Sequence, residues 1–216
     1  EDAFKSITDF INSNENSTLI IYMEKYSNLE KRIVKKFPEI DSVLFEGNDP
    51  QKFSAKILGI DSSNIRFNKI ADLNPNQTLA FAPRPRDDIK NILLILEPEK
   101  YQSILPAFKY HGGEKFQYIN FISSLEKIST VNQLLDFEDT FTPISLNLSQ
   151  KIQRKEIFSL ENILQRSSIS DWLTVEILKQ ANIKSAEISG MTGNILFQKN
   201  SCAQRNIPMQ MIHSNW

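Results

Sequence analysis

Four short apolar runs, each separated from the next by at least one helical segment, constrain the fold of this 216-residue chain more than any other feature. They lie at residues 18–23, 42–45, 92–96 and 117–121. Each run is apolar on both faces, which is typical of strands covered on both sides of a sheet. Strands that alternate with helices usually pair in parallel. The sequence therefore predicts an α/β fold, a parallel sheet flanked by helices.

The segments before and between these runs have helical periodicity. Residues 2–11 place Phe4, Ile7 and Ile11 on one helical face. Another helix follows Asp49, and a third begins after Glu97 with a proline in its first turn. These segments are long enough to cover a sheet, which supports the layered α/β prediction.

The pattern weakens after residue 122. Two separate helices are expected, at 160–165 and 170–180, and a β-rich tail is expected over 193–212. The predicted organisation is one α/β lobe made of residues 1–142 and 186–216. Residues 143–185 form a crossing segment and helices that lie outside this lobe.

Composition excludes several classes of function. The 25 basic and 26 acidic residues give a net charge of −1, so the chain lacks the basic field of a nucleic-acid-binding protein. The single cysteine, Cys202, excludes an internal disulfide and any site with several cysteine ligands. With only His111 and His213 besides, no metal site and no cofactor are expected.

Catalytic signatures are also missing from the sequence. It contains no phosphate-binding loop, no dinucleotide fingerprint, no nucleophile elbow and no zinc-protease motif. His111 and His213 have no catalytic partner nearby in the sequence. We therefore expect a protein that is not an enzyme and has no catalytic residues.

The densest polar feature is the stretch from Arg84 to Asp88, in which Pro83 and Pro85 stiffen the backbone. Two guanidinium groups, Arg84 and Arg86, could bind a carboxylate or phosphate. The alternative is that an arginine pairs locally with an aspartate and fixes the entry into strand 92–96. Arg84 and Arg86 are the binding residues that the sequence offers, and both interpretations stay open at this stage.

Nothing in the sequence predicts a membrane span. The longest apolar run, within residues 91–96, is far too short, and the first residues lack the pattern of a signal peptide. The chain is therefore expected to be cytosolic, or a mature or truncated piece of an exported protein.

Three stretches, in order, resemble the LppC/LpoA family of outer-membrane lipoproteins, which activate class A penicillin-binding proteins. Phe53–Arg66 is similar to the family's Leu-Leu-Gly segment with its following aspartate, serine and arginine. Pro83–Tyr110 resembles its Pro-Arg-Arg-x-Asp-Ile motif, strand and helix. Ile188–Phe197 and Arg205–Gln210 resemble its two closing strands, with Met209 in place of a tryptophan.

The resemblance implies a type I periplasmic-binding-protein-like fold, of which this chain would hold one lobe and part of the other. Residues 1–142 and 186–216 would be the second lobe, and residues 143–185 a remnant of the first. It also implies a non-catalytic periplasmic regulator of peptidoglycan synthesis, with a class A penicillin-binding protein as partner and peptidoglycan as a further contact. A first lobe, a helical-repeat domain and a lipidated cysteine would precede residue 1. The full-length protein would then sit at the outer membrane through that anchor alone.

A second function is kept beside this one. The same fold commonly closes on amino acids or similar solutes, so the chain could be a small-solute binding or sensing domain. Polar and aromatic side chains that face a cleft between two lobes would distinguish this function from a regulatory one.

Overall fold

A six-stranded sheet forms the centre of the molecule, in the order β2-β1-β3-β4-β5-β9. The computed structural model describes all residues except 1, 14–16, 77, 122–128, 154–158 and 214–216. The strands are β1 (Thr18–Tyr22), β2 (Asp41–Leu44), β3 (Asn91–Ile95), β4 (Gln117–Asn120), β5 (Thr140–Pro143) and β9 (Met209–Met211). The first five pair in parallel and β9 is antiparallel to β5. The predicted parallel sheet, with all four of its runs, is confirmed.

Strand β3 lies between β1 and β4 and is buried along its whole length. Its side chains alternate between the two faces of the sheet, so Ile92 and Leu94 enter one apolar cluster while Leu93 and Ile95 enter the other. Residues 92–95 are all apolar because both faces of this strand are covered, while buried Asn91 at its start donates to the Thr18 hydroxyl at 3.4 Å.

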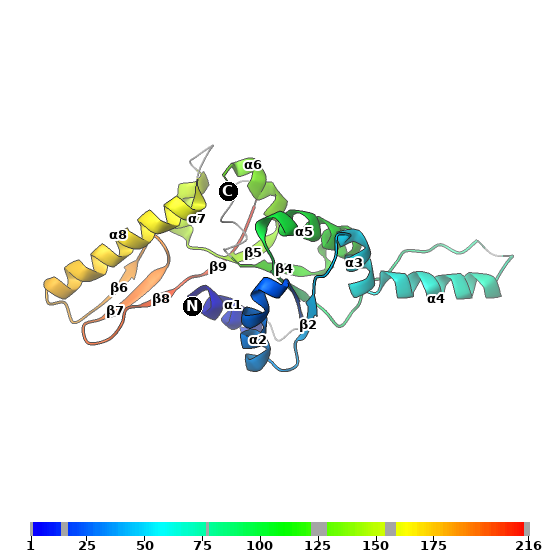
Figure 1. Cartoon of the computed structure of the whole chain (residues 1–216), viewed down its shortest axis with the longest axis horizontal. Coiled ribbons are helices and arrows are strands. Elements are labelled where there is room, and N and C mark those ends of the chain that lie inside the picture. Colours follow the sequence, from blue (N-terminus) through cyan, green and yellow to red (C-terminus); the bar gives the residue numbers. More distant parts are fainter. Residues whose placement is uncertain (1, 14–16, 77, 122–128, 154–158, 214–216) are drawn as a thin grey trace.

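Helices cover both faces of the sheet (Figure 1). One apolar cluster joins the sheet to α1 (Asp2–Ser13) and α2 (Ser27–Lys36). The opposite cluster joins it mainly to α3 (Pro50–Ile57), α5 (Pro98–Gly112), α6 (Val131–Leu134) and α7 (Leu146–Gln153). This arrangement is the α/β layering that the sequence predicts.

A smaller layer lies at one end of the molecule (Figure 1). It consists of α8 (Leu160–Gln180) and an antiparallel sheet of β6 (Ser185–Ser189), β7 (Asn194–Gln198) and β8 (Gln204–Asn206). Val175 of α8 packs on Ile195 and Phe197 of β7. The two helices expected at 160–165 and 170–180 are one helix, because residues 166–169 contain no proline or glycine to interrupt it.

A buried carboxylate ties α8 to this small sheet. Asp171 accepts hydrogen bonds from the backbone N–H groups of Met191 (2.7 Å) and Thr192 (2.8 Å), and from the Thr192 hydroxyl (2.6 Å). The same turn is held from α7, where Asn147 Nδ2 donates to the carbonyl of Gly190 at 2.9 Å. The turn between β6 and β7 is therefore fixed against two helices.

The tail of the chain divides between the two sheets. The sequence grouped residues 186–216 with residues 1–142, and that domain boundary stays a prediction. In the structure residues 185–206 pair among themselves beneath α8, and only β9 returns to the main sheet. The reason is that β7 buries only alternate residues, as a strand covered on one face does.

None of the helices in the described part of the chain is long and apolar enough to cross a membrane.

The central position of β3 predicts that Leu94→Asp is among the most damaging substitutions in the chain. Leu94 is 0% exposed, and an unpaired charge there would cost about 4 kcal/mol or more. Chemical denaturation measures this loss. If Leu94→Asp does not fold, Leu94→Ala gives the same comparison, with an expected loss of about 2–5 kcal/mol.

The matched control is the same pair of substitutions at Leu73, which is 80% exposed. Those variants should stay within about 0.5 kcal/mol of the parent. Equal stabilities for the Leu94 and Leu73 variants would contradict the central placement of β3.

Candidate interaction surface

Helix α4 (Ile60–Leu73) projects away from the sheet, and residues 78–84 return along it (Figure 1). We call α4 and residues 78–84 the arm. The arm begins at Gly59, whose φ of +74° lies in the left-handed region that favours glycine. This residue lets the chain turn sharply between the end of α3 and the start of α4.

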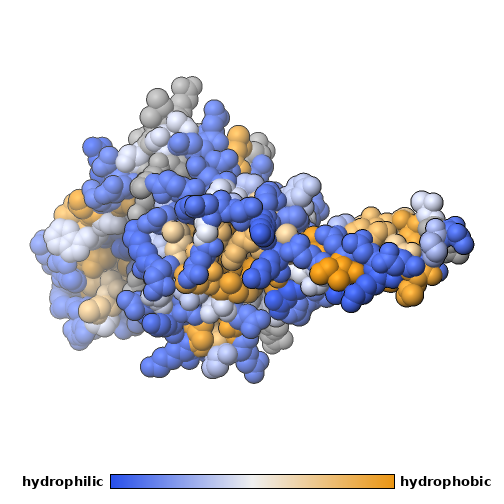
Figure 2. Space-filling view, turned by 45° about the vertical axis from the view of Figure 1, so that its right-hand side comes forward, coloured by the Kyte–Doolittle hydropathy of each residue, from blue (hydrophilic) through white to orange (hydrophobic). Residues whose placement is uncertain are grey.

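Large apolar side chains are exposed along the arm, as the orange residues at the right of Figure 2 show. They are Ile65, Ile70, Leu73 and Phe81. Phe81 stacks on Phe67 of α4, with ring centroids 4.2 Å apart, and so holds the returning segment against the helix. Exposed apolar groups that gather on one projecting element are typical of a surface that binds another protein.

Two arginines border this apolar surface. A hollow of about 630 Å³ on the arm is lined by Ser63, Arg66, Phe67, Ile70, Ala80, Phe81, Ala82 and Arg84. The backbone N–H of Arg84 donates to the Ser63 hydroxyl at 3.2 Å, which fixes the segment beside α4. The hollow therefore combines an apolar floor with two guanidinium groups.

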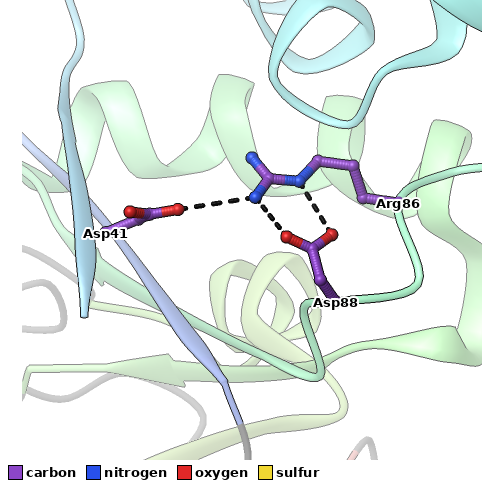
Figure 3. Close-up of polar contacts among 3 residues, drawn as sticks. All are labelled: Asp41, Arg86 and Asp88. Atoms are coloured by element: carbon purple, nitrogen blue, oxygen red, sulfur yellow. Dashed lines mark hydrogen bonds and ion pairs between the residues drawn. The ribbon is translucent and has the colours of Figure 1, made fainter. Parts of the chain in front are cut away.

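Arg86 lies at the base of the arm and pairs with two carboxylates (Figure 3). Its Nε donates to Asp88 Oδ1 at 3.0 Å, and its Nη2 donates to Asp88 Oδ2 and, at 3.4 Å, to Asp41 Oδ2. Its backbone N–H donates to the carbonyl of Leu58 at 2.9 Å. These contacts join the returning segment to the start of β2 and to the end of α3.

A second ion pair fixes the same segment to the start of β4. Lys115 Nζ donates to Asp87 Oδ1, and also to the carbonyl of Pro85 at 3.2 Å. The hydrogen bond from Lys115 lowers the pKa of Asp87, and the hydrogen bonds from Arg86 lower the pKa of Asp88. Both aspartates are therefore held as carboxylates against a cation.

The two predicted binding residues thus lie in different surroundings. Arg86 pairs within the chain, as the local-pairing interpretation expected. The Arg84 side chain is exposed on the arm and makes no ion pair with the residues that the structure describes. A ligand-binding role for either arginine stays a prediction.

The arm and its base lie at the amino edge of the parallel strands, because Arg86 and Lys115 contact the segments that lead into β2, β3 and β4. Ligands of open α/β sheets usually bind at the opposite, carboxyl edge. At that edge Lys25, after β1, pairs with Glu97, after β3, at 2.8 Å. The hydrogen bond to Glu97 raises the pKa of Lys25.

The remaining candidates from the sequence are scattered. His111 lies near the end of α5 against the ring of Tyr110, while His213 and Cys202 are exposed. Within the described ranges, no group of three or more His, Cys, Asp or Glu side chains could hold a metal ion.

Sequence reasoning missed the apolar surface of the arm. Ile70 and Leu73 are three residues apart, as on a helix face that packs on a core, and only their exposure in the structure distinguishes them. The chain between Gly59 and strand β3 is longer than a simple connection needs, and this length could have indicated a projecting element.

The base of the arm gives a pH-dependent prediction. A double-mutant cycle of Arg86→Met and Asp88→Asn should give a coupling energy of about 0.5–1 kcal/mol at neutral pH, since both groups are partly exposed and screened. Because the pKa of Asp88 is lowered in the folded chain, the pair stabilises above the ordinary aspartate pKa. The coupling should therefore disappear as the pH falls through the folded-state value.

Urea denaturation across this pH range measures the coupling. Arg84→Met is the control, and it should leave stability unchanged because its side chain has no ion pair in the described part of the chain. A coupling of zero at neutral pH would show that Arg86 does not hold the base of the arm.

Comparison with known proteins identifies the fold but not a family. No protein-family model matches the sequence, and neither does any curated protein sequence. Among solved structures, full-length LpoA from Haemophilus influenzae is similar over 100% of this chain and 38% of its own, with a TM-score of 0.55 and 8% identity. A putative branched-chain amino acid ABC transporter protein from Rhodospirillum rubrum is similar over 99% of this chain and 64% of its own length. Its TM-score is 0.55 and its identity is 11%.

This chain spans less than two thirds of the length of either similar structure. At these identities the likeness concerns the path of the backbone alone. The main parallel sheet, the helices on both of its faces and these two structures agree with the sequence-based expectation. The chain has a type I periplasmic-binding-protein-like α/β fold.

Proposed function

We propose that this chain is a non-catalytic protein-binding module and that the arm is its contact surface. The observation that carries the proposal is the group of exposed apolar side chains on an element that projects beyond the main sheet. Such an element can enter a groove of another protein without any movement of the fold that supports it. The ion pairs of Arg86 and Lys115 support this role because they hold the arm at its base.

The chemistry of the arm suggests the surface that it recognises. Ile70 and Phe81 would pack against apolar side chains of the partner, while Arg66 and Arg84 would pair with carboxylates at the rim. The partner surface should therefore be an apolar groove bordered by aspartate or glutamate.

The likeness to LpoA and the sequence resemblance point to one partner class. We infer that the module acts in the periplasm as a regulator of peptidoglycan synthesis and contacts a class A penicillin-binding protein, with peptidoglycan nearby. In the full-length protein an outer-membrane anchor would lie outside this chain. The position of the arm at the amino edge supports a protein contact, since it leaves the carboxyl edge of the sheet uninvolved.

A second candidate function, the binding of a small solute, is favoured by the likeness to the Rhodospirillum rubrum transporter protein. In such a case the solute would bind at the carboxyl edge, where Lys25 and Glu97 lie. Their mutual ion pair would have to open or turn toward the solute, so this function predicts that substitution of Lys25 abolishes binding.

Titration calorimetry of the chain against purified class A penicillin-binding proteins tests the proposal. We expect saturable binding, and the double substitution Ile70→Glu with Leu73→Glu should weaken it about tenfold or more, because two charges would enter an apolar contact. Both positions are exposed, so the variant should fold like the parent.

The matched control is Leu196→Glu, an exposed apolar position on β7 in the small layer at the other end of the molecule. It should bind like the parent. Saturable binding of an amino acid or muropeptide that is lost in Lys25→Ala, without binding to any synthase, would overturn the proposal in favour of the solute-binding function.

A further inference from the structure

The outer face of α8, which points away from the small sheet, is apolar and exposed. The inner face buries Ile163, Asp171 and Val175. The outer face presents Ile169, which is 57% exposed, and Leu173, which is 48% exposed. Trp172 and Ile177 lie on its two flanks and are also exposed. No described residue of the chain covers this face.

The residues along the centre of this face are spaced alternately by four and three, which is the spacing of a coiled-coil seam. In order they are Asn162, Arg166, Ile169, Leu173, Glu176 and Gln180. This spacing keeps all six on one side of the helix over about 30 Å of its length. We call these six residues the outer seam.

The outer seam is complementary to itself when it is read in the opposite direction. Its end residues, Asn162 and Gln180, both carry amides. Next to them stand opposite charges, Arg166 and Glu176, and at the centre stand two apolar residues. Each pair is symmetric about position 171, so an antiparallel second helix would set every residue against its complement.

We propose that a second copy of this chain docks on the outer seam, with its α8 antiparallel to the first. A two-fold axis near residue 171 would place Arg166 of each copy against Glu176 of the other, and Ile169 against Leu173. Such an interface is isologous, because the same patch of both copies forms it. A parallel arrangement would instead set Arg166 against Arg166 and Glu176 against Glu176, which like charges oppose.

The charges of the seam are available for this contact. On one flank of the helix, Lys179 Nζ donates to Glu176 Oε1 at 2.6 Å, so Arg166 of a second copy would share this partly exposed carboxylate. Arg166 is exposed and makes no ion pair with any residue in the described part of the chain. Trp172 would lie close to its symmetry mate near the axis and add apolar contact area.

The small apolar area of the outer seam sets the expected affinity between two copies. The seam buries only two apolar side chains per copy at its centre, with Trp172 and Ile177 beside them, so the interface is a small one. We expect a reversible equilibrium of monomer and dimer with a dissociation constant in the micromolar range. The arm lies at the other end of the molecule, so the dimer would leave it free (Figure 1).

Sedimentation equilibrium of the whole chain with exchanged charges tests the pairing. Arg166→Glu alone sets two glutamates together at both contacts, and Glu176→Arg alone sets two arginines together. Each single variant should self-associate about tenfold more weakly than the parent, or worse. An equimolar mixture of the two variants should associate again, because each contact then joins opposite charges.

The double variant, Arg166→Glu with Glu176→Arg, should likewise regain association, and it keeps the test valid if one single variant proves less helical by circular dichroism. Arg66→Glu on the arm is the matched control and should associate like the parent. A parent that stays monomeric at high concentration overturns the proposal. A dimer whose dissociation constant is unchanged in the single charge variants also overturns it. Another face would then form the dimer, and the seam would be left for a different protein or segment.

Discussion

The complete burial of β3 is the constraint on which the rest of the structure depends. The strand pairs in parallel on both edges and is covered on both faces, so none of its backbone or side-chain groups meets water. Parallel pairing requires each connection to cross back over the sheet, and those connections supply the covering helices. The positions of the arm and of the carboxyl edge both follow from this arrangement.

The arm shows how a connection of this kind can acquire another role. Helix α3, in the connection from β2 to β3, already packs on the sheet, and α4 adds Ile60 to the same core. The rest of α4 can therefore extend outward. The arm packs little against the sheet, but at its base Arg86 and Lys115 form ion pairs with three aspartates near the first residues of the strands. Ion pairs at an exposed site contribute little to overall stability. Their effect here is to give the arm one direction.

The small layer of α8 and β6–β8 is covered on fewer sides than the main sheet. Three short strands and one helix cannot bury much apolar surface, and the described chain leaves the outer side of α8 uncovered. Asp171 compensates in part, because its carboxylate fixes the turn between β6 and β7 with three hydrogen bonds. The uncovered side is the one whose charges and apolar residues complement a second copy. A dimer would join two molecules at these ends and leave the arms available for the proposed partner.

Much of the fold could be predicted from the sequence, because a strand buried on both faces is mostly apolar. Runs such as 18–23 and 92–96 therefore identified the parallel sheet and its covering helices, and the pairing of an arginine with a nearby aspartate could be expected from Arg86 and Asp88. Other features depended on tertiary structure. The sequence of α4 suits a buried helix as well as an exposed one, so the exposure of Ile70 and Leu73 appears only when the packing is known. The same holds for α8, whose apolar residues occur on both sides. Only its contact with β7 decides which side is the interior and which is left for a partner, because helical periodicity gives the faces of a helix but not what each face meets.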